Sequence, residues 1–592
     1  MNEPKRLFDC IEYQLKNTPL PDMLAGKEDG VWRKYSSAEV INIVDQLSSG
    51  LLYEGISNND NTVEGRDKVA ILSKNRPEWL IVDLAVQKIG AVFTPIYPTV
   101  HVNDLEFILN DAAIKIIFVN DQMLYEKVQS IKDKLPLLKK IYSFEKIQNV
   151  NHWQELFNND PELLIKVKSI ADSINTNDIA TIIYTSGTTG KPKGVMLSHK
   201  NIVSNILASM PCFPPDKYMR ALSFLPLNHI LERMVSYLYV YSGTSIYYAE
   251  NLDTIGENLK EIKPHLFTTV PRLLEKIYDK IMAKGNELSG IKRKLFFWAH
   301  DLATKYEINK NLGFAYNLQL SIANKIVFKK WREGVGGELK AIISGGAACQ
   351  VRLIRIFTAA QIPIMEGYGL TETSPVISVN NWNVKDRMFG TVGPIIDGVE
   401  VKIADDGEIL CNGPNLMMGY YKHPELTDEV MEDGWFKTGD IGMMINNRFL
   451  KITDRKKEMF KTSGGKYVAP LPIETKLKES MYIENAMVIG AEQRYTGALI
   501  VPSFSNVREW CKKNNIEFTT DELMVKNGII INFYKELVET YNKNFNNVEQ
   551  IKKFELLPHD WGVETGELTP KLSLKRKVIM EKYRDAVARI YA

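Results

Sequence analysis

One stretch of the chain decides its fold: Tyr184-Thr185-Ser186-Gly187-Thr188-Thr189-Gly190-Lys191-Pro192-Lys193-Gly194. It follows directly on the apolar run from Ile179 to Ile183, which has the composition of a buried strand. Glycine lets a backbone approach a ligand closely, and successive N–H groups can then surround an anion. The threonine and serine hydroxyls and the two lysines add further groups that bind anions. The stretch therefore predicts a polyphosphate-binding loop at the end of a strand.

The spacing of this loop excludes the common nucleotidase phosphate loop. That pattern needs Gly, four residues and then Gly-Lys-Ser/Thr. Counted from Gly187, the second glycine falls on Pro192, so the pattern fails. The alternative to a phosphate site is a flexible surface turn rich in Gly and Thr.

Length and composition place the chain among ordinary globular proteins of more than one domain. It has 592 residues, 45% hydrophobic and 25% charged, with a formal net charge of +2. A charge so close to zero gives no reason to expect nucleic acid as a partner. The five cysteines are scattered without C-x-x-C spacing, which favours a reducing compartment over disulfides or zinc. With no apolar run of signal-peptide or membrane-spanning type, we expect a cytoplasmic protein.

Strand and helix patterns alternate in the first third of the chain. We expect strands at 69–72, 91–96 and 114–119, and helices at 77–86 and 102–109. Such alternation predicts parallel pairing, with ligands bound beyond the carboxyl ends of the strands. The pattern returns near 339–343, 353–360 and 362–365.

The pattern of expected strands and helices changes after about residue 400. Short strands separated by turns are expected from Val401 to Ile452, followed by the charged connector Thr453-Asp454-Arg455-Lys456-Lys457-Glu458. Beyond it we expect a helix at 473–478 and strands at 486–489 and 498–501. The boundaries that follow are 1–455 for a large domain and 456–592 for a small α+β domain.

The stretch from Tyr184 to Gly194 resembles the phosphate loop of the AMP-forming acyl-adenylating enzymes, and nearly the full chain resembles their long-chain fatty acyl-CoA synthetase branch. Further matching strings occur in the same order along the chain: Asn75-Arg76-Pro77-Glu78-Trp79, Leu225-Pro226-Leu227-Asn228-His229-Ile230-Leu231-Glu232-Arg233, Gly367-Tyr368-Gly369-Leu370-Thr371-Glu372, Gly434-Trp435-Phe436-Lys437-Thr438-Gly439-Asp440 and Leu568-Thr569-Pro570. The resemblance implies an α/β fold: a large N-terminal domain of wound α/β sheets with a distorted β subdomain, and a small mobile α+β C-terminal domain.

The resemblance implies a role for each part of the nucleotide site. The loop residues would bind the phosphates of ATP, with Lys193 catalytic: Thr185, Ser186, Gly187, Thr188, Thr189 and Gly190. In the string from Gly367 to Glu372, Thr371 would contact phosphate, Glu372 would bind Mg²⁺ and Tyr368 would stack on adenine between Gly367 and Gly369. A carboxylate is a suitable ligand for Mg²⁺, a hard cation. The alternative for Thr371 and Glu372 is a capping pair that opens a helix.

Two further segments would complete the nucleotide site. Asp440 would accept hydrogen bonds from the ribose hydroxyls, although an Asx-turn is a common role for Asp after Gly. The segment Ser344-Gly345-Gly346-Ala347 would line adenine and the acyl carboxylate. A plain strand-to-helix turn is the alternative there.

His229 would lie at the mouth of the acyl pocket, although a histidine between apolar residues is more often a packed residue. Some relatives carry a gating tryptophan four residues after this histidine, where the present chain has Arg233. Gating by an indole is therefore not expected.

The connector and the carboxyl terminus would serve the small domain. Arg455 would contact ribose and Lys457 would be the hinge, unless the connector is only a solvated run of charges. Lys461, Gly464 and Gly465 would reach the site in a second, thioester-forming orientation. The family places a catalytic lysine three residues before an arginine; counted from Arg576, that position is Ser573, and Lys571 or Lys575 would have to replace it.

Bases and aromatics alternate at Lys292-Arg293-Lys294-Leu295-Phe296-Phe297-Trp298 and at Lys329-Lys330-Trp331-Arg332. No nucleic-acid recognition motif accompanies them. A basic amphipathic helix on lipid and a packed helical hairpin with solvated lysines are both consistent with this composition.

The sequence thus predicts ATP-dependent activation of a long-chain fatty acid to acyl-CoA through acyl-AMP, with release of AMP and pyrophosphate. ATP, Mg²⁺ and coenzyme A would take part, at the cytoplasmic side and with peripheral contact at the inner membrane surface. One alternative is transfer of the acyl group to a carrier-protein thiol; another is a weakened acyl- or nucleotide-binding protein, as the serine at Ser573 would permit. The sequence leaves chain length and oligomeric state open.

Overall fold

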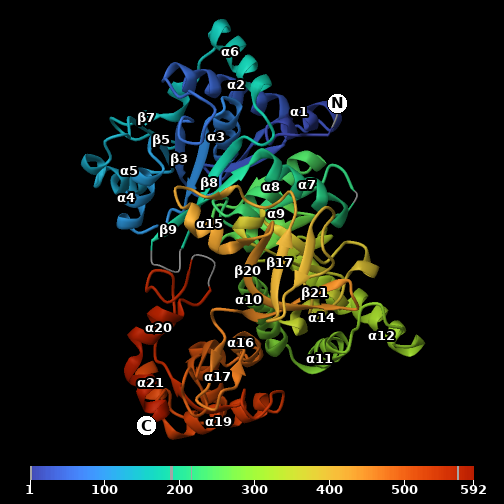
Figure 1. Cartoon of the computed structure of the whole chain (residues 1–592). Helices are drawn as coiled ribbons and strands as arrows, with labels where there is room; N and C mark the ends of the chain where they lie inside the picture. Colours follow the sequence, from blue (N-terminus) through green and yellow to red (C-terminus); the bar gives the residue numbers. More distant parts are fainter. Residues whose placement is uncertain (1–2, 187–190, 215, 252, 570–572) are drawn as a thin grey trace.

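The computed structural model describes residues 3–186, 191–214, 216–251, 253–569 and 573–592. The large N-terminal part contains two eight-stranded sheets (Figure 1). One has the order β18-β9-β8-β4-β3-β5-β6-β7 and the other the order β15-β14-β13-β12-β10-β11-β1-β2. Both sheets are mainly parallel, as the alternation of strands and helices predicts.

The expected strands of the first sheet are present. They are β3 (Lys68–Leu72), β4 (Val92–Ile96), β5 (Ile114–Val119) and β8 (Ile179–Ser186), joined at the far edge by β6 (Lys140–Ser143) and β7 (Asn151–His152). Every residue of β3 and β4 is buried, which explains their continuous apolar runs. The sequence did not predict β9 (Pro192–Ser198), which pairs antiparallel with β8, nor β18 (Gly419–Tyr420), which pairs with β9. The glycine-rich stretch therefore connects two antiparallel strands.

The second sheet is formed by segments from distant parts of the chain. Its strands are β1 (Leu24–Glu28), β2 (Val31–Tyr35), β10 (Arg220–Ser223), β11 (Ser245–Tyr248), β12 (Leu266–Thr269), β13 (Ala341–Ser344), β14 (Ile364–Gly369) and β15 (Val376–Val379). The helix α14 (Val351–Ala359) connects β13 to β14 as expected.

Helices pack between and around these sheets. α3 (Pro77–Lys88) has all its residues buried, and α8 (Ile230–Ser242) is buried along most of its length. Both helices lie inside the molecule, where the main hydrophobic core joins them to both sheets. Around them lie α2 (Ser37–Tyr53), α4 (Val102–Asp111), α6 (Pro161–Ser173) and α7 (His199–Ser209).

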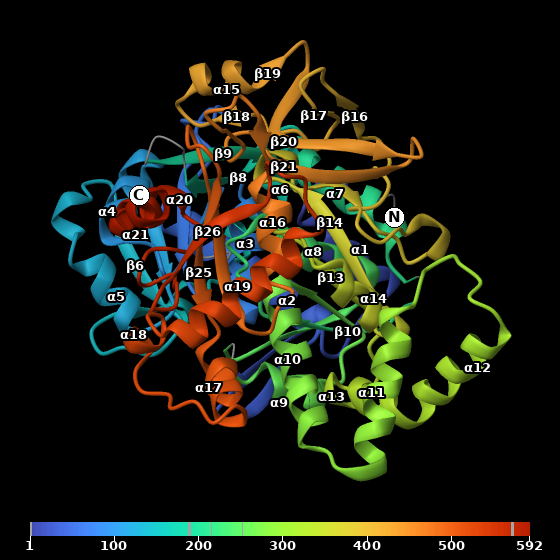
Figure 2. The same ribbon diagram turned by 90° about the horizontal axis from the view of Figure 1, so that it is seen from below.

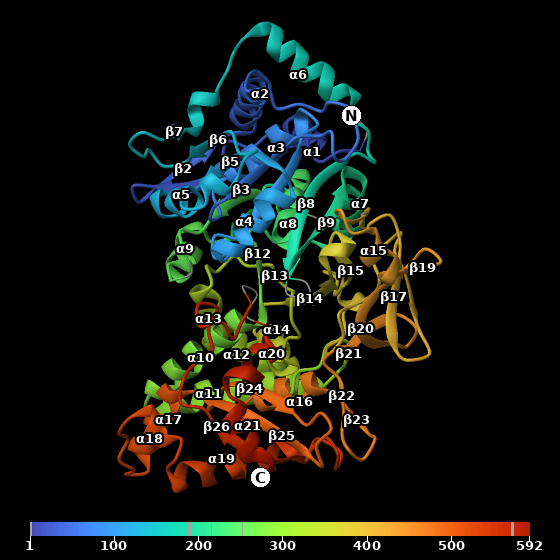
Figure 3. The same ribbon diagram turned by 60° about the vertical axis from the view of Figure 1, so that its left-hand side comes forward.

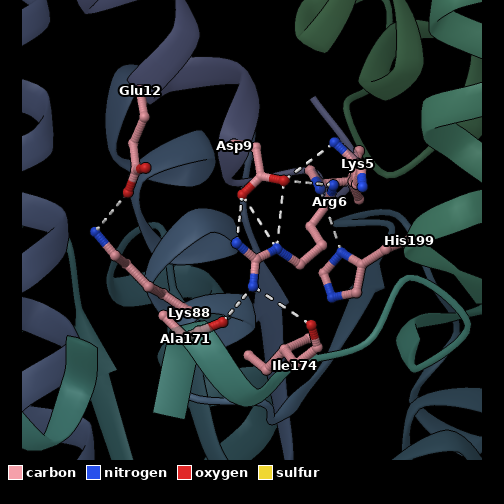
Figure 4. Close-up of polar contacts among 9 residues, drawn as sticks. Lys5, Arg6, Asp9, Glu12, Lys88, Ala171, Ile174 and His199 are labelled. Atoms are coloured by element: carbon pink, nitrogen blue, oxygen red, sulfur yellow. Dashed lines mark hydrogen bonds and ion pairs between the residues drawn. The ribbon is translucent and has the colours of Figure 1, made fainter. Parts of the chain in front are cut away.

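The N-terminal helix α1 (Asp9–Asn17) is attached to the core by a small polar network (Figure 4). The Arg6 guanidinium donates to the Asp9 carboxylate at 2.8 Å and to the Ile174 carbonyl at 3.3 Å. The Leu7 N–H donates to Nδ1 of the buried His199 at 3.3 Å. Burial lowers the pKa of His199 to about 3, with Arg6 acting in the same direction, so this ring stays neutral. Its role is structural.

A distorted antiparallel β subdomain follows, as expected. It consists of β16 (Glu400–Ile403), β17 (Glu408–Asn412), β19 (Met431–Glu432), β20 (Trp435–Ile445) and β21 (Phe449–Arg455). Register shifts interrupt the pairing of β20 with both β17 and β21. In Figure 3 this subdomain lies beside the ends of β14 and β15.

The C-terminal part is an α+β unit with its own core. The three-stranded sheet β24 (Ile483–Ile489), β25 (Thr496–Pro502) and β26 (Ile551–Leu556) packs against α16 (Pro470–Leu477), α17 (Phe504–Lys513) and α19 (Gly528–Asn542). A short hairpin of β22 (Phe460–Lys461) and β23 (Tyr467–Val468) precedes it. On the other face of the sheet lie α20 (Arg576–Lys582) and α21 (Arg584–Tyr591).

The basic and aromatic segments form a packed group of helices. α11 (Gly290–Thr304) packs with α12 (Phe314–Ala323), the π-helical turn η4 (Asn324–Phe328) and α13 (Lys329–Gly334). Phe296 and Trp331 are buried against each other, with ring centroids 5.8 Å apart. These two aromatic side chains belong to the core, as expected for a packed helical hairpin. All five cysteines are buried and free.

Candidate active site

A cavity of about 1440 Å³ opens where the two sheets, the β subdomain and the C-terminal part meet. It lies beyond the ends of β8, β13 and β14, as expected for a ligand site in a parallel sheet. Figure 3 shows these strands converging above the C-terminal part. The cavity brings together these sequence-predicted residues: Thr185, Lys193, His229, Gly345, Gly346, Gly367, Tyr368, Gly369, Thr371, Glu372, Asp440, Arg455, Lys457 and Lys575.

Lys193 and Glu372 meet in this cavity through Tyr420. The Lys193 Nζ donates to the Tyr420 hydroxyl at 2.5 Å, and that hydroxyl donates to Glu372 Oε1 at 2.9 Å. The same lysine lies 3.5 Å from Glu372 Oε1. Burial lowers the pKa of Lys193 and Lys457 acts in the same direction, whereas Glu372 raises it. The cluster places a cation and a carboxylate beside the end of the glycine-rich stretch.

The local fold explains how the three side chains meet. β18 pairs with β9 so that Tyr420 lies opposite Val195, two residues beyond Lys193. Glu372 lies in the short 3₁₀ helix η5 (Thr371–Thr373), directly after β14. The cap of η5 is supplied by Thr373, whose hydroxyl accepts from the Leu370 N–H at 2.9 Å. The capping role that the sequence left open for Thr371 and Glu372 is thus filled by Thr373.

A second polar group forms the opposite wall. The Tyr368 hydroxyl donates to Asp440 Oδ2 at 2.7 Å, and Arg455 Nε lies 3.5 Å from Asp440 Oδ1. Burial raises the pKa of Asp440, while Arg455 and Tyr368 lower it. The turn hydrogen bond at this point comes from Thr438, whose hydroxyl accepts from the Asp440 N–H at 3.1 Å. The Asp440 carboxylate is therefore directed to Tyr368 and Arg455 instead of to its own turn.

Glycines keep the wall between these groups flat. A Cβ at Gly369 would lie 1.7 Å from the Pro375 carbonyl oxygen, and one at Gly345 would lie 2.9 Å from a Leu231 methyl. Gly346 has φ +80°, a conformation that favours glycine. The Ser344 hydroxyl is buried and has no hydrogen-bond partner among the described residues. Ala347 is exposed and lies outside the cavity wall.

His229 and Arg233 have separate environments although they share α8. His229 is the N-cap of the helix, where its Nδ1 accepts from the Leu231 N–H at 3.2 Å, and its side chain lines the cavity. Arg233 is fully buried, with its guanidinium 2.6 Å from the Asp83 carboxylate and 2.8 Å from the Thr181 hydroxyl. Arg233 belongs to the core, so it does not gate the acyl pocket.

The C-terminal part contributes one of its two candidate segments to the cavity. Thr569, Ser573 and Lys575 line the cavity, and Leu568 and Leu574 form an isolated antiparallel bridge. Arg576 is turned away, toward Glu474 and Glu458. The second segment, with Lys461, Gly464 and Gly465, lies on the hairpin β22–β23 and does not line the cavity.

Several sequence-predicted residues lie outside the described part of the chain. They are Gly187, Thr188, Thr189, Gly190 and Lys571. The backbone of Ser186 ends β8. Tyr420 is the residue that sequence reasoning missed, because a tyrosine after a glycine in Met417-Met418-Gly419-Tyr420-Tyr421 carries no spacing that links it to Lys193 or Glu372.

The donor set at Glu372 fits a magnesium ion. Mg²⁺ commonly takes one or two protein carboxylates and completes its shell with water and substrate phosphates. Glu372 supplies one carboxylate on the wall of a cavity wide enough for a nucleotide. Among the described residues, no group of three or more His, Cys, Asp or Glu side chains is arranged to hold a metal ion.

Fold and site together define an α/β protein with a polar cavity between its large N-terminal part and its smaller C-terminal part. Residues 12–421 match the family of AMP-binding enzymes, and residues 458–592 match the C-terminal domain of AMP-binding enzymes. The chain belongs to this family.

Two relatives are similar over almost their whole length. A protein of Mycobacterium bovis named long-chain-fatty-acid–CoA ligase FadD15 is 32% identical, over 95% of this chain and 93% of the relative. Long chain acyl-CoA synthetase 3 of Arabidopsis thaliana is 30% identical, over 99% of this chain and 91% of the relative. Among solved structures, the adenylation domain of a carboxylate reductase from Mycobacterium chelonae superposes with a TM-score of 0.76 at 19% identity, over 100% of this chain and 92% of that one. This last likeness supports the fold.

Proposed function

We propose that this protein activates a long-chain fatty acid with ATP, forms acyl-AMP and pyrophosphate, and then transfers the acyl group to coenzyme A with release of AMP. The observation that carries the proposal is the joining of two polar walls in one cavity. The Lys193–Tyr420–Glu372 cluster is suited to phosphates, and the Tyr368–Asp440–Arg455 group is suited to a nucleoside. Relatives that cover nearly the whole chain are named as long-chain-fatty-acid–CoA ligases.

The apolar part of the cavity gives the acyl chain a place. Apolar side chains from several elements line the same cavity as His229: Ile183, Phe213, Met234, Val235, Val376 and Val379. Burial of methylene groups against such a wall contributes about 0.8 kcal/mol for each CH₂. This wall favours a fatty acid over a short or charged acid.

In the first half-reaction, a carboxylate oxygen of the fatty acid attacks the α-phosphorus, and the bond from that phosphorus to the bridging oxygen breaks. The electron pair of this bond leaves with pyrophosphate, so no proton is transferred. The residues act by positioning and by stabilising charge. Lys193 and Thr371 would contact the phosphates, and Glu372 would hold Mg²⁺, which neutralises phosphate charge when it is bound.

The nucleoside would lie against the second wall. Asp440 would accept from the ribose hydroxyls with Arg455 beside it, and the ring of Tyr368 would stack on adenine against Gly345 and Gly346. In the second half-reaction, the thiol of coenzyme A attacks the acyl carbon and gives its proton to water. The bond from that carbon to the phosphate oxygen breaks, and AMP leaves with the electron pair.

We propose that the chain divides between residues 455 and 456 and that the two domains change their orientation between the half-reactions. β21 ends at Arg455, and Lys457 follows in the connector. We propose that the domain 456–592 rotates about Lys457, which would bring Lys461, Gly464 and Gly465 from the hairpin β22–β23 to the cavity. Thr569, Ser573 and Lys575 line the cavity. We propose that this orientation serves adenylation.

The experiment for the first half-reaction measures pyrophosphate release from palmitate and MgATP. Lys193→Ala should reduce this rate about a hundredfold, because it removes a charge that stabilises the transition state. Lys191→Ala is the matched control, since Lys191 is exposed and lies over the Phe107 ring at 5.7 Å. Thioester formation from supplied palmitoyl-AMP should be affected less. If the wild-type protein binds ATP but releases no pyrophosphate, it would instead be a weakened binding protein.

The acceptor is tested separately. With palmitate and MgATP present, coenzyme A and a carrier protein with a phosphopantetheine thiol are compared at equal concentration. If the thioester forms faster on the carrier protein, the carrier protein and not coenzyme A is the acyl acceptor.

We further propose that the protein works as a peripheral protein at the inner membrane surface, because a long-chain fatty acid partitions into bilayers. Among the described residues, no helix combines the length and hydropathy that crossing a membrane requires.

A further inference from the structure

The helix α12 and the turn η4 expose a row of large apolar side chains. Phe314, Leu318, Ile322 and Ile326 are 84%, 52%, 44% and 48% exposed. They follow one another at intervals of four, which places neighbours on the same side of a helix. In an α-helix, residues four apart are displaced slightly around the helix axis, always in the same direction. The wider π-helical turn at Asn324–Phe328 displaces them in the opposite direction, so the four residues stay on one side. These four residues are called the apolar row.

The apolar row is presented on a well-anchored helix. On the inner side of α12, the Tyr316 hydroxyl donates to the Leu302 carbonyl at 2.8 Å, and Trp298 Nε1 donates to Gln319 Oε1 at 3.3 Å. Phe328 is fully buried. The packing of the inner side leaves the outer side without a partner in the described chain. Figures 1 and 2 both show α12 at the outer edge of the molecule.

Positive charge surrounds the apolar row. Residues 280–334 contain eleven Lys or Arg and four Asp or Glu, although the whole chain has a net charge of +2. Lys325, Lys329 and Lys330 are exposed at the C-terminal end of the row. Lys329 has a distant acidic neighbour, with its Nζ 3.9 Å from Glu333. Ile291 and Leu295 on α11 add exposed apolar area, at 76% and 38% exposure.

We propose that the apolar row inserts into the headgroup layer of an anionic lipid bilayer while the surrounding lysines contact the lipid headgroups. Exposed apolar patches rimmed by charge mark interaction sites, and a helix with one apolar side and a basic border is suited to an anionic membrane surface. A second copy of the chain is a poorer partner. In a two-fold dimer the same surface meets itself, which would bring the lysines of both copies together.

The biological purpose of this membrane contact rests on the proposed function. The proposal adds which surface of the protein meets the membrane and which class of lipid it binds. The surface differs from the one expected from the aromatic residues Phe296 and Trp298. Phe296 is buried and Trp298 is half-buried against α12, so neither is available for lipid.

The test is sedimentation of the full chain with vesicles of phosphatidylcholine alone or mixed with phosphatidylglycerol. Three variants are compared: Leu318→Asp/Ile322→Asp in the row, Lys325→Glu/Lys329→Glu/Lys330→Glu at its border, and Ile165→Asp as the control. Ile165 is 70% exposed on α6, outside this helical group. We expect wild type and Ile165→Asp to bind the anionic vesicles, and both other variants to lose about tenfold or more in affinity.

Two results would overturn the proposal. One is equal vesicle binding by all variants. The other is a dimer, detected by light scattering, that Leu318→Asp/Ile322→Asp converts to monomer. Thioester formation from palmitate dispersed in detergent should stay unchanged in both surface variants. Lack of that activity in the wild type would contradict the proposed function while leaving the vesicle result valid.

Discussion

The phenol of Tyr420 lies between Lys193 and Glu372 and is hydrogen-bonded to both, at 2.5 Å and 2.9 Å. Three separate segments of the chain supply these side chains. The pairing of β18 with β9 brings Tyr420 to Lys193, and the Met417 N–H donates to the Glu372 carbonyl at 2.9 Å, which joins the segment before β18 to η5. Because one hydroxyl fixes both a cation and a carboxylate, we infer that it orients the groups that receive MgATP.

Tyr420→Phe should therefore slow adenylation. It removes one hydrogen bond to each charged group but keeps the ring, whose centroid lies 3.8 Å from the Lys193 Nζ. Hydrogen bonds to charged groups contribute about 1.5–3 kcal/mol, so a loss of roughly tenfold or more in kcat/KM for MgATP is expected. Pyrophosphate release at varied Mg²⁺ concentration measures it, with Tyr421→Phe as the neighbouring control. Equal kinetics in the two variants would contradict the role of Tyr420.

The missing lysine at Ser573 leads to a second prediction. Lys575 lines the cavity, whereas Lys577 is exposed on α20. We expect Lys575→Ala or Lys571→Ala to reduce pyrophosphate release about tenfold to a hundredfold and to spare thioester formation from palmitoyl-AMP, because the lost charge acts at the α-phosphate. Lys577→Ala is the control. Introducing Ser573→Lys into the slower variant should restore the rate; full activity in a Lys571→Ala/Lys575→Ala double variant would exclude both lysines.

Contacts between the two domains predict a third effect. Arg272 of α10 (Pro271–Glu287) pairs with Glu484 of β24, and Gln350 Nε2 donates to the Lys478 carbonyl at 3.1 Å. Partly exposed ion pairs contribute about 0.2–1 kcal/mol. Glu484→Arg should therefore reduce adenylation only a few-fold, with a smaller effect on the second half-reaction. The swapped pair Arg272→Glu/Glu484→Arg should recover the rate, and strict additivity of the two losses would argue against coupling.

The buried His199 predicts a dependence of stability on pH. Its pKa is about 3 in the folded chain against a usual value of 6.5, so below pH 6.5 the unfolded state binds the proton preferentially. Stability should fall by about 1.4 kcal/mol for each pH unit between 6.5 and 3. His199→Asn keeps an acceptor for the Leu7 N–H and does not titrate. Its denaturation midpoint should change less between pH 7 and pH 5 than that of the wild type; parallel curves would assign the dependence to other groups.

Much of the fold follows from local pattern. The apolar runs at 69–72, 114–119 and 179–183 are strands because a strand of a parallel sheet is covered on both faces and therefore contains few polar side chains. Pro77 begins α3 because its missing N–H costs nothing at the first helical position. Residue types and their order also placed Lys193, Glu372, Tyr368 and Asp440 in one site. Four glycine-rich loop positions from Gly187 to Gly190, and Lys571, stay predictions because they lie outside the described residues.

The sequence by itself determined the family of the protein, because its short motifs occur in the order that the family has, whatever residues surround them. Only the tertiary structure decided which side chains touch. Tyr420 is 227 residues from Lys193 and 48 from Glu372. The pairing of β18 with β9 brings it to Lys193, and the packing of η5 beside the segment before β18 brings it to Glu372. The same holds for Arg233, which is withdrawn into the core by Asp83, and for the apolar row, which is exposed because the other side of α12 is packed. Contacts between distant segments depend on how whole sheets and helices pack, and local spacing contains no record of that packing.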